Sequence, residues 1–271
     1  MKSLDVGTDR VQEHEEKISM FRQSKKIVRN IIRKTGFDVV RYDSAHVLRT
    51  NHFLRLNARR LEHLASLRIP VANMSVLEVG SGIGEHSHYY KDRGCTITIT
   101  EARPASLHYL KKRYPDCVVR FLDMDNPSSV DGSPFDIVHC YGVLYHLAKP
   151  EQALAFLSNN VRKMLFLETC VSFGESEEIN LVKETKNDPI STYSGAGCRP
   201  TRKWVYTQLK RHFEYVYLPK TQPNHEQFPL DWTAPDKHKN RLQRAVFIAS
   251  REQLENEILV SSLIMKQIYH E

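Results

Sequence analysis

Two spacings of apolar residues alternate along this chain of 271 residues. Apolar residues three or four positions apart predict helices, whereas short runs of β-branched and apolar residues predict strands buried on both faces. The spacing predicts helices over residues 11–34, 50–67, 87–93, 104–113 and from Thr201 onward, and strands over 75–79, 95–100, 117–121, 135–140, 161–171, 215–218 and 245–250. This alternation is typical of an α/β fold with a doubly wound, mostly parallel sheet.

The two ends of the chain carry further helical patterns. Residues 1–49 are predicted to form a helical extension, and residues 50–271 the main domain. Acidic residues begin the first helix and basic residues end it, which suits the helix dipole; its basic end could bind an anionic membrane or nucleic acid, or could simply be solvated. In the 50–67 helix, Arg59 and Arg60 are expected on the solvent side. The tail over 252–269 is predicted to be one amphipathic helix that packs on the core.

A glycine-rich turn follows the first predicted strand, in the segment SVLEVGSGIGEH over residues 75–86. Glycine suits backbone angles that a Cβ forbids, and it lets a ligand approach the main chain. A helix that starts after the turn offers free N–H groups and a positive dipole. Gly80, Gly82 and Gly84 are spaced G-x-G-x-G rather than the dinucleotide spacing G-x-G-x-x-G. A nicotinamide or nucleotide site, or a purely structural turn, are the alternatives at this point.

The spacing G-x-G-x-G, with Glu78 two residues earlier, resembles motif I of the class I S-adenosylmethionine-dependent methyltransferases. The resemblance implies seven strands in the order 3-2-1-4-5-7-6 with strand seven antiparallel, and S-adenosylmethionine as cofactor. It implies that Glu101, at the end of the second strand, binds the ribose hydroxyls and that Asp123, beside Met124, meets the adenine amino group. The cofactor-binding residues that it predicts are Glu78, Gly80, Ser81, Gly82, Gly84, Glu101, Asp123, Met124 and Tyr141.

Residues 141–147, reading YGVLYHL, resemble the segment after motif II in that family, which lies beside the transferable methyl group. The Asn-Pro-Pro-Tyr pattern of enzymes that methylate base amines is absent, which argues against methylation of nucleobase nitrogens. A hydroxyl acceptor gains from a base, and a histidine has a pKa near neutrality. We therefore predict His146 as the base and Tyr145 as a residue that orients the acceptor, with Glu168 and His225 as alternative bases. His139 is expected in the core, and His86 in a structural role.

Two long connections, over 174–200 and 220–241, are predicted to be lids over the carboxyl edge of the sheet. Their aromatic residues Tyr193, His225, Phe228 and Trp232 indicate packing. Arg199, Arg202 and Lys203 could bind a phosphate or carboxylate of the acceptor, or could be a solvated helix start.

The composition gives the net charge and indicates the cellular compartment. The net charge of +7 allows an anionic partner. Five cysteines without a C-x-x-C pair indicate a reducing compartment with neither a disulfide framework nor a zinc site, and no metal site is predicted. No signal-type or membrane-spanning apolar run occurs, so a cytoplasmic protein is expected, with peripheral membrane contact and the oligomeric state left open. The predicted function is O-methylation of a polar small molecule or glycan. The alternatives are an RNA-directed (tRNA-modifying) enzyme and a catalytically silent cofactor-binding subunit.

Overall fold

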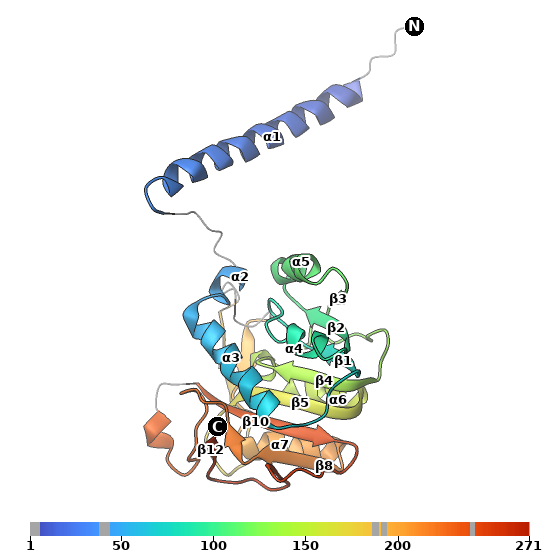
Figure 1. Ribbon diagram of the computed structural model, residues 1–271, viewed down its shortest axis with the longest axis vertical. Helices are drawn as coiled ribbons and strands as arrows, with labels where there is room; N and C mark the ends of the chain where they lie inside the picture. Colours follow the sequence, from blue (N-terminus) through green and yellow to red (C-terminus); the bar gives the residue numbers. More distant parts are fainter. Residues whose placement is uncertain (1–5, 38–43, 186–189, 191–193, 239–241, 271) are drawn as a thin grey trace. The chain divides into compact units, whose positions relative to one another are not determined.

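The computed structural model describes residues 6–37, 44–185, 190, 194–238 and 242–270, and it divides into two compact units, 1–42 and 43–271 (Figure 1). The predicted boundary between extension and main domain, at 49/50, stays a prediction. Tyr193, one of the aromatic residues expected to pack in the first long connection, lies outside the described residues.

The first unit contains the predicted helix, α1 (Val6–Arg33), which ends close to Gly36 in the left-handed backbone region. Its apolar residues Met20, Phe21, Ile27, Val28 and Ile31 recur at helical spacing, and all of them are exposed. Among the helices that the structure describes, none combines the length and apolar composition that crossing a membrane needs.

The second unit is built on one eight-stranded sheet with the order β11-β8-β10-β5-β4-β1-β2-β3. Its strands are β1 (Ser75–Glu78), β2 (Thr96–Glu101), β3 (Val118–Phe121), β4 (Phe135–Tyr141), β5 (Val161–Val171), β8 (Tyr215–Pro219), β10 (Gln243–Ser250) and β11 (Leu259–Val260). β1 to β5 pair in parallel, and β10 inserts antiparallel between β5 and β8. The predicted order of seven strands is confirmed, and β11 adds an eighth strand at the edge.

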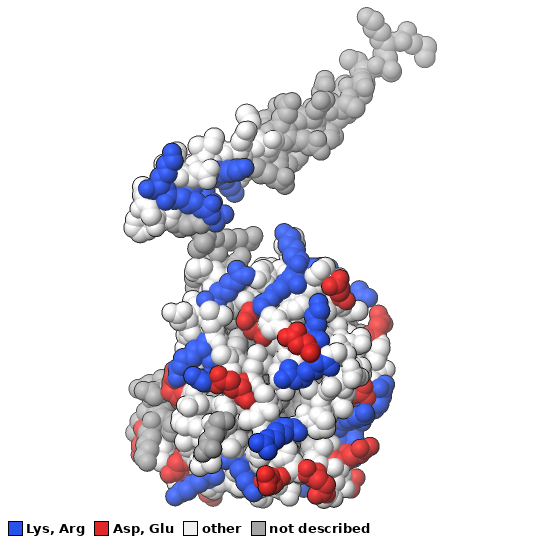
Figure 2. Space-filling model, viewed as in Figure 1, with Lys and Arg blue, Asp and Glu red and all other residues white. Residues whose placement is uncertain are grey.

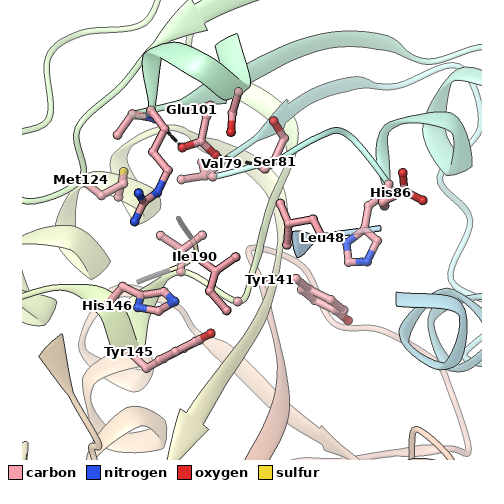
Figure 3. Close-up of a pocket in the computed structure, with 18 of the residues that line it drawn as sticks. Leu48, Val79, Ser81, His86, Glu101, Met124, Tyr141, Tyr145, His146 and Ile190 are labelled. Atoms are coloured by element: carbon pink, nitrogen blue, oxygen red, sulfur yellow. Dashed lines mark hydrogen bonds between the residues drawn. The ribbon is translucent and has the colours of Figure 1, made fainter. Parts of the chain in front are cut away.

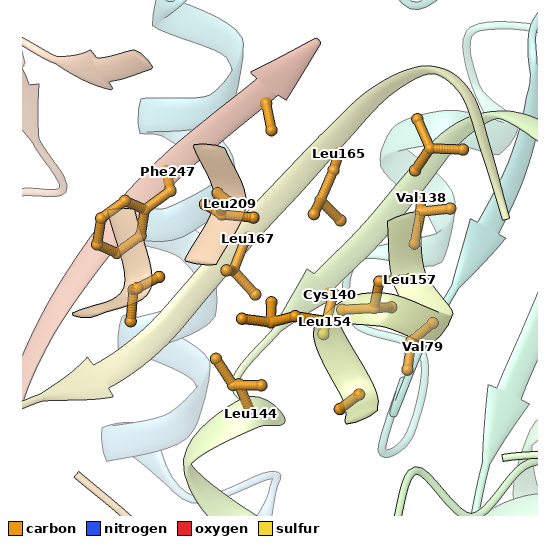
Figure 4. Packing of buried hydrophobic residues seen from close by; sticks show 14 of the residues in the cluster. Val79, Val138, Cys140, Leu144, Leu154, Leu157, Leu165, Leu167, Leu209 and Phe247 are labelled. Carbon is orange, nitrogen blue, oxygen red and sulfur yellow. The ribbon is translucent and has the colours of Figure 1, made fainter. Parts of the chain in front are cut away.

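Helices cover both faces of this sheet. One face packs against α3 (Asn51–Ser66), α4 (Ser87–Lys91) and α5 (Pro104–Arg113), and the other against α6 (Pro150–Asn159) and α7 (Arg202–His212). Figure 4 shows the second layer, in which Leu154 and Leu157 of α6 meet Val138, Leu165 and other strand residues. The predicted helices over 50–67, 104–113 and after Thr201 are confirmed; the Thr201 hydroxyl caps α7 by accepting the Trp204 N–H.

Alternation along three adjacent strands decides which polar side chains meet. Val138 and Cys140 of β4, Leu165 and Leu167 of β5, and Phe247 of β10 pack under α6 and α7. Because successive side chains of a strand point to opposite faces, the residues between them face the α3 layer. These alternate positions include His139 and Tyr141 of β4, Glu168 of β5 and Arg244 of β10, and Tyr141 pairs with Glu168 in register.

The first long connection contains a hairpin, β6 (Leu181–Lys183) paired with β7 (Ala196–Cys198). The other short elements are α2 (Ser44–Val47), β9 (Thr221–Gln222), β12 (Ile268–Tyr269) and the 3-10 turns η1 (Leu144–His146) and η2 (Pro235–His238).

The prediction of one helix over 252–269 is wrong. The tail instead pairs β11 with β8 and β12 with β9, and Gln267 accepts hydrogen bonds from Gln222 Nε2 at 3.0 Å and Trp232 Nε1 at 2.8 Å. The physical reason is that β8 would otherwise be an edge strand with unpaired backbone groups, which the tail satisfies. Lys220 N, for example, donates to Ile258 O at 2.7 Å.

Candidate active site

A cavity of about 490 Å³ lies at the carboxyl ends of β1, β2 and β4. The predicted site residues that line it are Glu78, Gly80, Ser81, Gly82, Glu101, Asp123, Met124, Tyr141, Tyr145 and His146. In Figure 3, Val79, Ser81 and Glu101 lie along one side, and Tyr145 and His146 lie opposite them. Gly84 does not line the cavity. The sheet therefore brings residues from four separate parts of the chain to one space.

The glycine turn requires its glycines for two different reasons. Gly80 has φ 63°, and a Cβ there would lie 2.3 Å from Cγ2 of Val143, so the turn and the segment after β4 are in direct contact. Gly84 has φ 77°, and its Cβ would lie 2.4 Å from Tyr114. Gly80 thus shapes the cavity wall, whereas Gly84 permits packing under α5.

Glu101 is buried at the end of β2, and its carboxylate is held by backbone donors. Oε2 accepts the Gly82 N–H at 2.8 Å, and Oε1 accepts the N–H groups of Ala102 and Arg103 at 3.0 and 2.9 Å. Burial raises the pKa of this carboxyl, and the backbone bonds oppose the rise. The carboxylate therefore ties the glycine turn to the second strand while lining the cavity.

Glu78 lies at the end of β1 and is also buried. Its Oε2 accepts the Ser87 hydroxyl at 2.5 Å. Burial raises the pKa of this carboxyl to about 7. No cation of the described residues forms an ion pair with it. A positively charged ligand in the cavity would supply that missing charge.

Asp123 and Asp125 organise the loop after β3. Asp123 Oδ1 accepts the Asp125 N–H at 3.0 Å. The buried Asp125 carboxylate accepts the N–H groups of Ala148 and Lys149 at 2.8 and 3.2 Å, just before α6. Asp125 was not predicted from the sequence. An acid that accepts N–H groups at a helix start can be recognised only once the loop after β3 and the start of α6 are known to meet.

A chain of histidine and tyrosine side chains forms part of the cavity wall, to which His86, His139 and Tyr141 contribute. His86 Nδ1 lies 3.0 Å from His139 Nε2, and His139 Nδ1 lies 2.9 Å from the Tyr90 hydroxyl. Tyr141 stacks on His139 with ring centroids 4.2 Å apart. Burial lowers the pKa of His139 to about 3 and that of His86 well below its ordinary value, so both rings are neutral. The buried position expected for His139 is confirmed; the Tyr141 hydroxyl is buried without a hydrogen-bond partner in the described part of the chain.

His146 and Glu184 form a dyad at the other side of the cavity. His146 Nδ1 lies 2.7 Å from Glu184 Oε2, and Arg199 Nη2 donates to Glu184 Oε1 at 3.1 Å. Burial lowers the pKa of His146, and Glu184 partly opposes this by raising it. The carboxylate favours the tautomer with the proton on Nδ1, which places the lone pair on Nε2. Glu184 was not predicted, because it follows β6 in a connection without a distinguishing pattern.

Tyr145 lies between two guanidinium groups. Arg199 Cζ and Arg244 Cζ lie 5.1 and 5.0 Å from the centroid of its ring, and Arg244 Nη2 donates to its hydroxyl at 3.3 Å. This arrangement fixes the ring against the cavity wall and makes that end of the cavity cationic.

The expectation that Arg60 faces solvent is wrong, since only 6% of it is exposed. Its Nη2 donates to Glu168 Oε2 at 2.6 Å, and Arg244 Nη1 donates to Glu168 Oε1 at 3.0 Å. The neighbouring Arg59 is exposed and pairs with Glu62. Both carboxylate oxygens of Glu168 are held by guanidinium groups and Glu168 does not line the cavity, which argues against it as the base.

Two predicted anion-binding residues lie elsewhere. Arg202 is buried against Trp232, with Cζ 4.1 Å from the ring, and donates to Ile264 O at 2.8 Å; Lys203 is exposed on α7. Of the three basic residues near Pro200, only Arg199 lines the cavity. Arg202 instead helps to hold the tail on the domain.

Among the described residues, one group of three has the spacing of metal ligands: His52, His225 and Glu226. The Gln227 N–H donates to His225 Nδ1 at 3.2 Å, which leaves the proton of the neutral ring on Nε2, the atom that would have to coordinate. Glu226 pairs with Arg55 at 2.6 Å. Because His225 does not line the cavity, these contacts favour a structural role over that of the alternative base.

Comparison with known proteins identifies the domain. A family model described as a methyltransferase domain matches residues 77–165, which run from β1 into β5. Residues 77–165 therefore match a methyltransferase domain, and the chain shares its fold with solved S-adenosylmethionine-dependent methyltransferases. No curated protein sequence matches this chain.

Solved structures share the fold of this methyltransferase at low sequence identity. The N-terminal domain of EvdMO1, solved in the presence of S-adenosylhomocysteine and D-fucose, is 16% identical with a TM-score of 0.55, and the match covers 72% of this chain and 83% of that one. An S-adenosylmethionine-dependent methyltransferase from Mesorhizobium loti is 14% identical with a TM-score of 0.52, covering 73% and 100%. The [4+2]-cyclase SpnF is 12% identical with a TM-score of 0.51, covering 71% and 80%.

The residues of this methyltransferase domain fit the cofactor that its class uses. Gly80 and Gly82 line the cavity without side chains, Glu78 is a buried carboxyl that forms no ion pair with the described residues, and Glu101 presents a carboxylate to the cavity. An amino acid ammonium group and a ribose diol are the chemical partners that such groups accept.

Proposed function

We propose that this methyltransferase uses S-adenosylmethionine to methylate a hydroxyl oxygen of a polar small molecule or glycan. The observation that carries the proposal is the pair formed by His146 and Glu184, 2.7 Å apart. A hydroxyl oxygen becomes a better nucleophile when a base takes its proton, whereas an amine acceptor needs no base. A half-buried imidazole oriented by a carboxylate therefore favours oxygen as the acceptor atom.

The cofactor supplies a methyl group on an already activated sulfonium, so the chain mainly aligns the acceptor. In this proposal, Glu78 binds the cofactor's ammonium group and Glu101 its ribose hydroxyls, while Gly80, Ser81 and Gly82 let it approach the backbone. Asp123, Met124 and Tyr141 contribute further cavity wall on the cofactor side. Gly84 supports the turn from behind.

The base acts from the opposite wall. Nε2 of His146 takes the proton of the acceptor hydroxyl, and the bound cofactor would supply the methyl group that the hydroxyl oxygen receives in exchange for that proton. Glu184 stabilises the resulting imidazolium through Nδ1–H, and Tyr145 orients the acceptor. The proton then returns to water, which regenerates the neutral imidazole.

The choice of acceptor rests on one structural neighbour and on the charge pattern of the surface. The EvdMO1 domain was solved in the presence of S-adenosylhomocysteine and D-fucose, which supports a sugar-like acceptor for this fold. Basic and acidic side chains are interspersed over the face of the 43–271 unit seen in Figure 2, which does not favour an extended nucleic acid track on that face.

The test is a methylation screen with the purified full chain. Metabolite, glycan and tRNA pools from cells are incubated with S-adenosylmethionine, and both S-adenosylhomocysteine and products heavier by one methylene are measured by mass spectrometry. We expect release from the metabolite or glycan pool and none from tRNA. Methylated tRNA would overturn the acceptor assignment, and uptake of a nicotinamide coenzyme in place of the sulfonium donor would overturn the function.

A second candidate is a chain with this fold that performs no methyl transfer. SpnF, described as a cyclase, has the same fold. Cofactor binding without any S-adenosylhomocysteine release across all three pools would favour this reading.

A further inference from the structure

At one end of the cavity, Arg60 and Arg244 share a single carboxylate partner among the described residues. Glu168 is fully buried, and it is the only acidic side chain of the described residues that pairs with Arg60 or Arg244. Two guanidinium groups and one carboxylate leave one excess positive charge. A buried, uncompensated charge is costly, so this arrangement calls for a partner.

The hydrogen bonds of the two arginines leave donors unused. Arg60 donates to Asn57 Oδ1 at 3.0 Å and to Glu168, while its Nε is buried without an acceptor in the described part of the chain. Arg244 donates to Gln227 Oε1 at 2.7 Å, to Glu168 and to Tyr145. Its five N–H groups exceed these contacts.

Both guanidinium groups belong to the wall of the cavity. Arg60 and Arg244 line it, and Arg60 lies against the backbone at the end of β4, where a Cβ on Gly142 would be 3.3 Å from Nη2. Arg244 contacts Tyr145, the residue next to the proposed base. Glu168 lies behind them and holds both guanidinium groups in position.

We propose that Arg60 and Arg244 form an anion subsite that binds a carboxylate or phosphate of the acceptor. This inference rests on the proposed function. It narrows the acceptor to a hydroxylated acid, such as a sugar acid or a sugar phosphate. Planar guanidinium groups bind such oxyanions with two parallel hydrogen bonds. A bound oxyanion would therefore offset part of the free-energy cost of burying the charges of Arg60 and Arg244. The carboxylate of the cofactor's amino acid has the same chemistry, so the test separates the two sources.

The first experiment compares matched polyols on the full chain loaded with S-adenosylhomocysteine. D-glucuronate and D-glucose 6-phosphate are titrated against D-glucose by calorimetry at constant ionic strength. We expect at least one of the acids to bind at least tenfold more tightly than glucose. Arg244→Met should reduce that preference below threefold, and Arg244→Lys, which keeps the charge, should retain part of it. Equal binding of all three sugars by the unmodified chain overturns the proposal and requires no variant to fold.

The second experiment tests the cofactor as the source of the anion. S-adenosylhomocysteine carries the amino acid carboxylate, and 5′-methylthioadenosine lacks it. The proposal expects Arg60→Met and Arg244→Met to leave both dissociation constants within threefold. A tenfold loss confined to S-adenosylhomocysteine would assign the subsite to the cofactor and overturn the acceptor assignment. If the unmodified chain binds no S-adenosylhomocysteine, the proposed function fails; binding without preference for the acids overturns only this inference.

Discussion

Gly80 and Val143 are in such close contact that a single added methyl group would not fit between them. A Cβ at Gly80 would lie 2.3 Å from Val143 Cγ2. The contact joins the turn after β1, which is the proposed cofactor-binding turn, to the segment after β4 that carries the proposed base.

Gly80→Ala should therefore destabilise the domain. The substitution combines a φ of 63° with the collision, and we expect a loss of about 2–4 kcal/mol in the free energy of unfolding. Adding Val143→Ala should restore the part due to the collision and leave the part due to backbone strain. Denaturant unfolding of the two variants measures this, and an unchanged midpoint for Gly80→Ala would contradict the described turn.

Glu101 should contribute to cofactor affinity both through its charge and through the backbone N–H groups that it holds. Glu101→Ala leaves the N–H groups of Gly82, Ala102 and Arg103 without their acceptor and removes the proposed ribose contact. We expect S-adenosylhomocysteine to bind about 10–100-fold more weakly, about 1.4–2.7 kcal/mol. Glu101→Gln keeps the shape and should lose less. Calorimetry compares the three proteins, and equal affinities would reject the ribose assignment.

Glu78 should make the stability of the domain depend on pH. Its pKa is raised to about 7 in the folded chain, against about 4.3 for an unfolded glutamate. The neutral form therefore contributes stability that is fully present below pH 4.3 and is lost as the pH rises through 7, by up to about 3–4 kcal/mol. Glu78→Gln should flatten this part of the profile. Thermal unfolding between pH 4 and 8 measures the difference between the two proteins.

The same carboxyl should couple cofactor binding to proton release. An ammonium group beside Glu78 would favour its ionised form, so S-adenosylhomocysteine binding near pH 6.5 should release a proton. Calorimetry in buffers of different ionisation enthalpy detects this release. The Glu78→Gln variant should show none of it, and equal proton release in both proteins would rule out Glu78 as the source.

The pairing of His146 with Glu184 predicts how kcat depends on pH. His146→Gln should lower kcat about 10²–10⁴-fold on the acceptor that the screen identifies, with cofactor affinity nearly unchanged. In Glu184→Gln the contribution that raises the pKa of His146 is lost, so the acidic limb of the rate profile should move to lower pH while kcat falls. If kcat falls while the acidic limb of the rate profile stays at the same pH, Glu184 acts only on the fold.

A substitution of Gln267 tests whether the C-terminal tail is held on the domain as β11 and β12. Its side chain accepts from Gln222 and Trp232 and donates to Pro219 O at 2.7 Å. Gln267→Ala leaves these buried groups unpaired, and we expect a loss of about 1–3 kcal/mol. Gln253→Ala, in an exposed part of the tail, is the matched control and should change stability little. Equal midpoints for the two variants would contradict this account.

The sequence by itself was sufficient for what neighbouring residues decide. The runs of β-branched residues and the helical spacing predicted the strands and their order through the resemblance, and the spacing of Gly80 and Gly82 before Glu101 predicted a ligand turn that does line the cavity. These features follow from local backbone preferences and side-chain period, which a short window of sequence contains.

Tertiary structure alone decided which distant residues meet. His146 and Glu184 are 38 positions apart, and Arg60 and Glu168 are 108 apart. The sequence places Arg60 on the polar face of its helix, which predicts contact with solvent. Arg60 is buried because β5 presents Glu168 to the face of the sheet that α3 covers. The tail became strands because β8 left an open edge. Pairing of strands and compensation of buried charge depend on the whole fold, and no local pattern contains them.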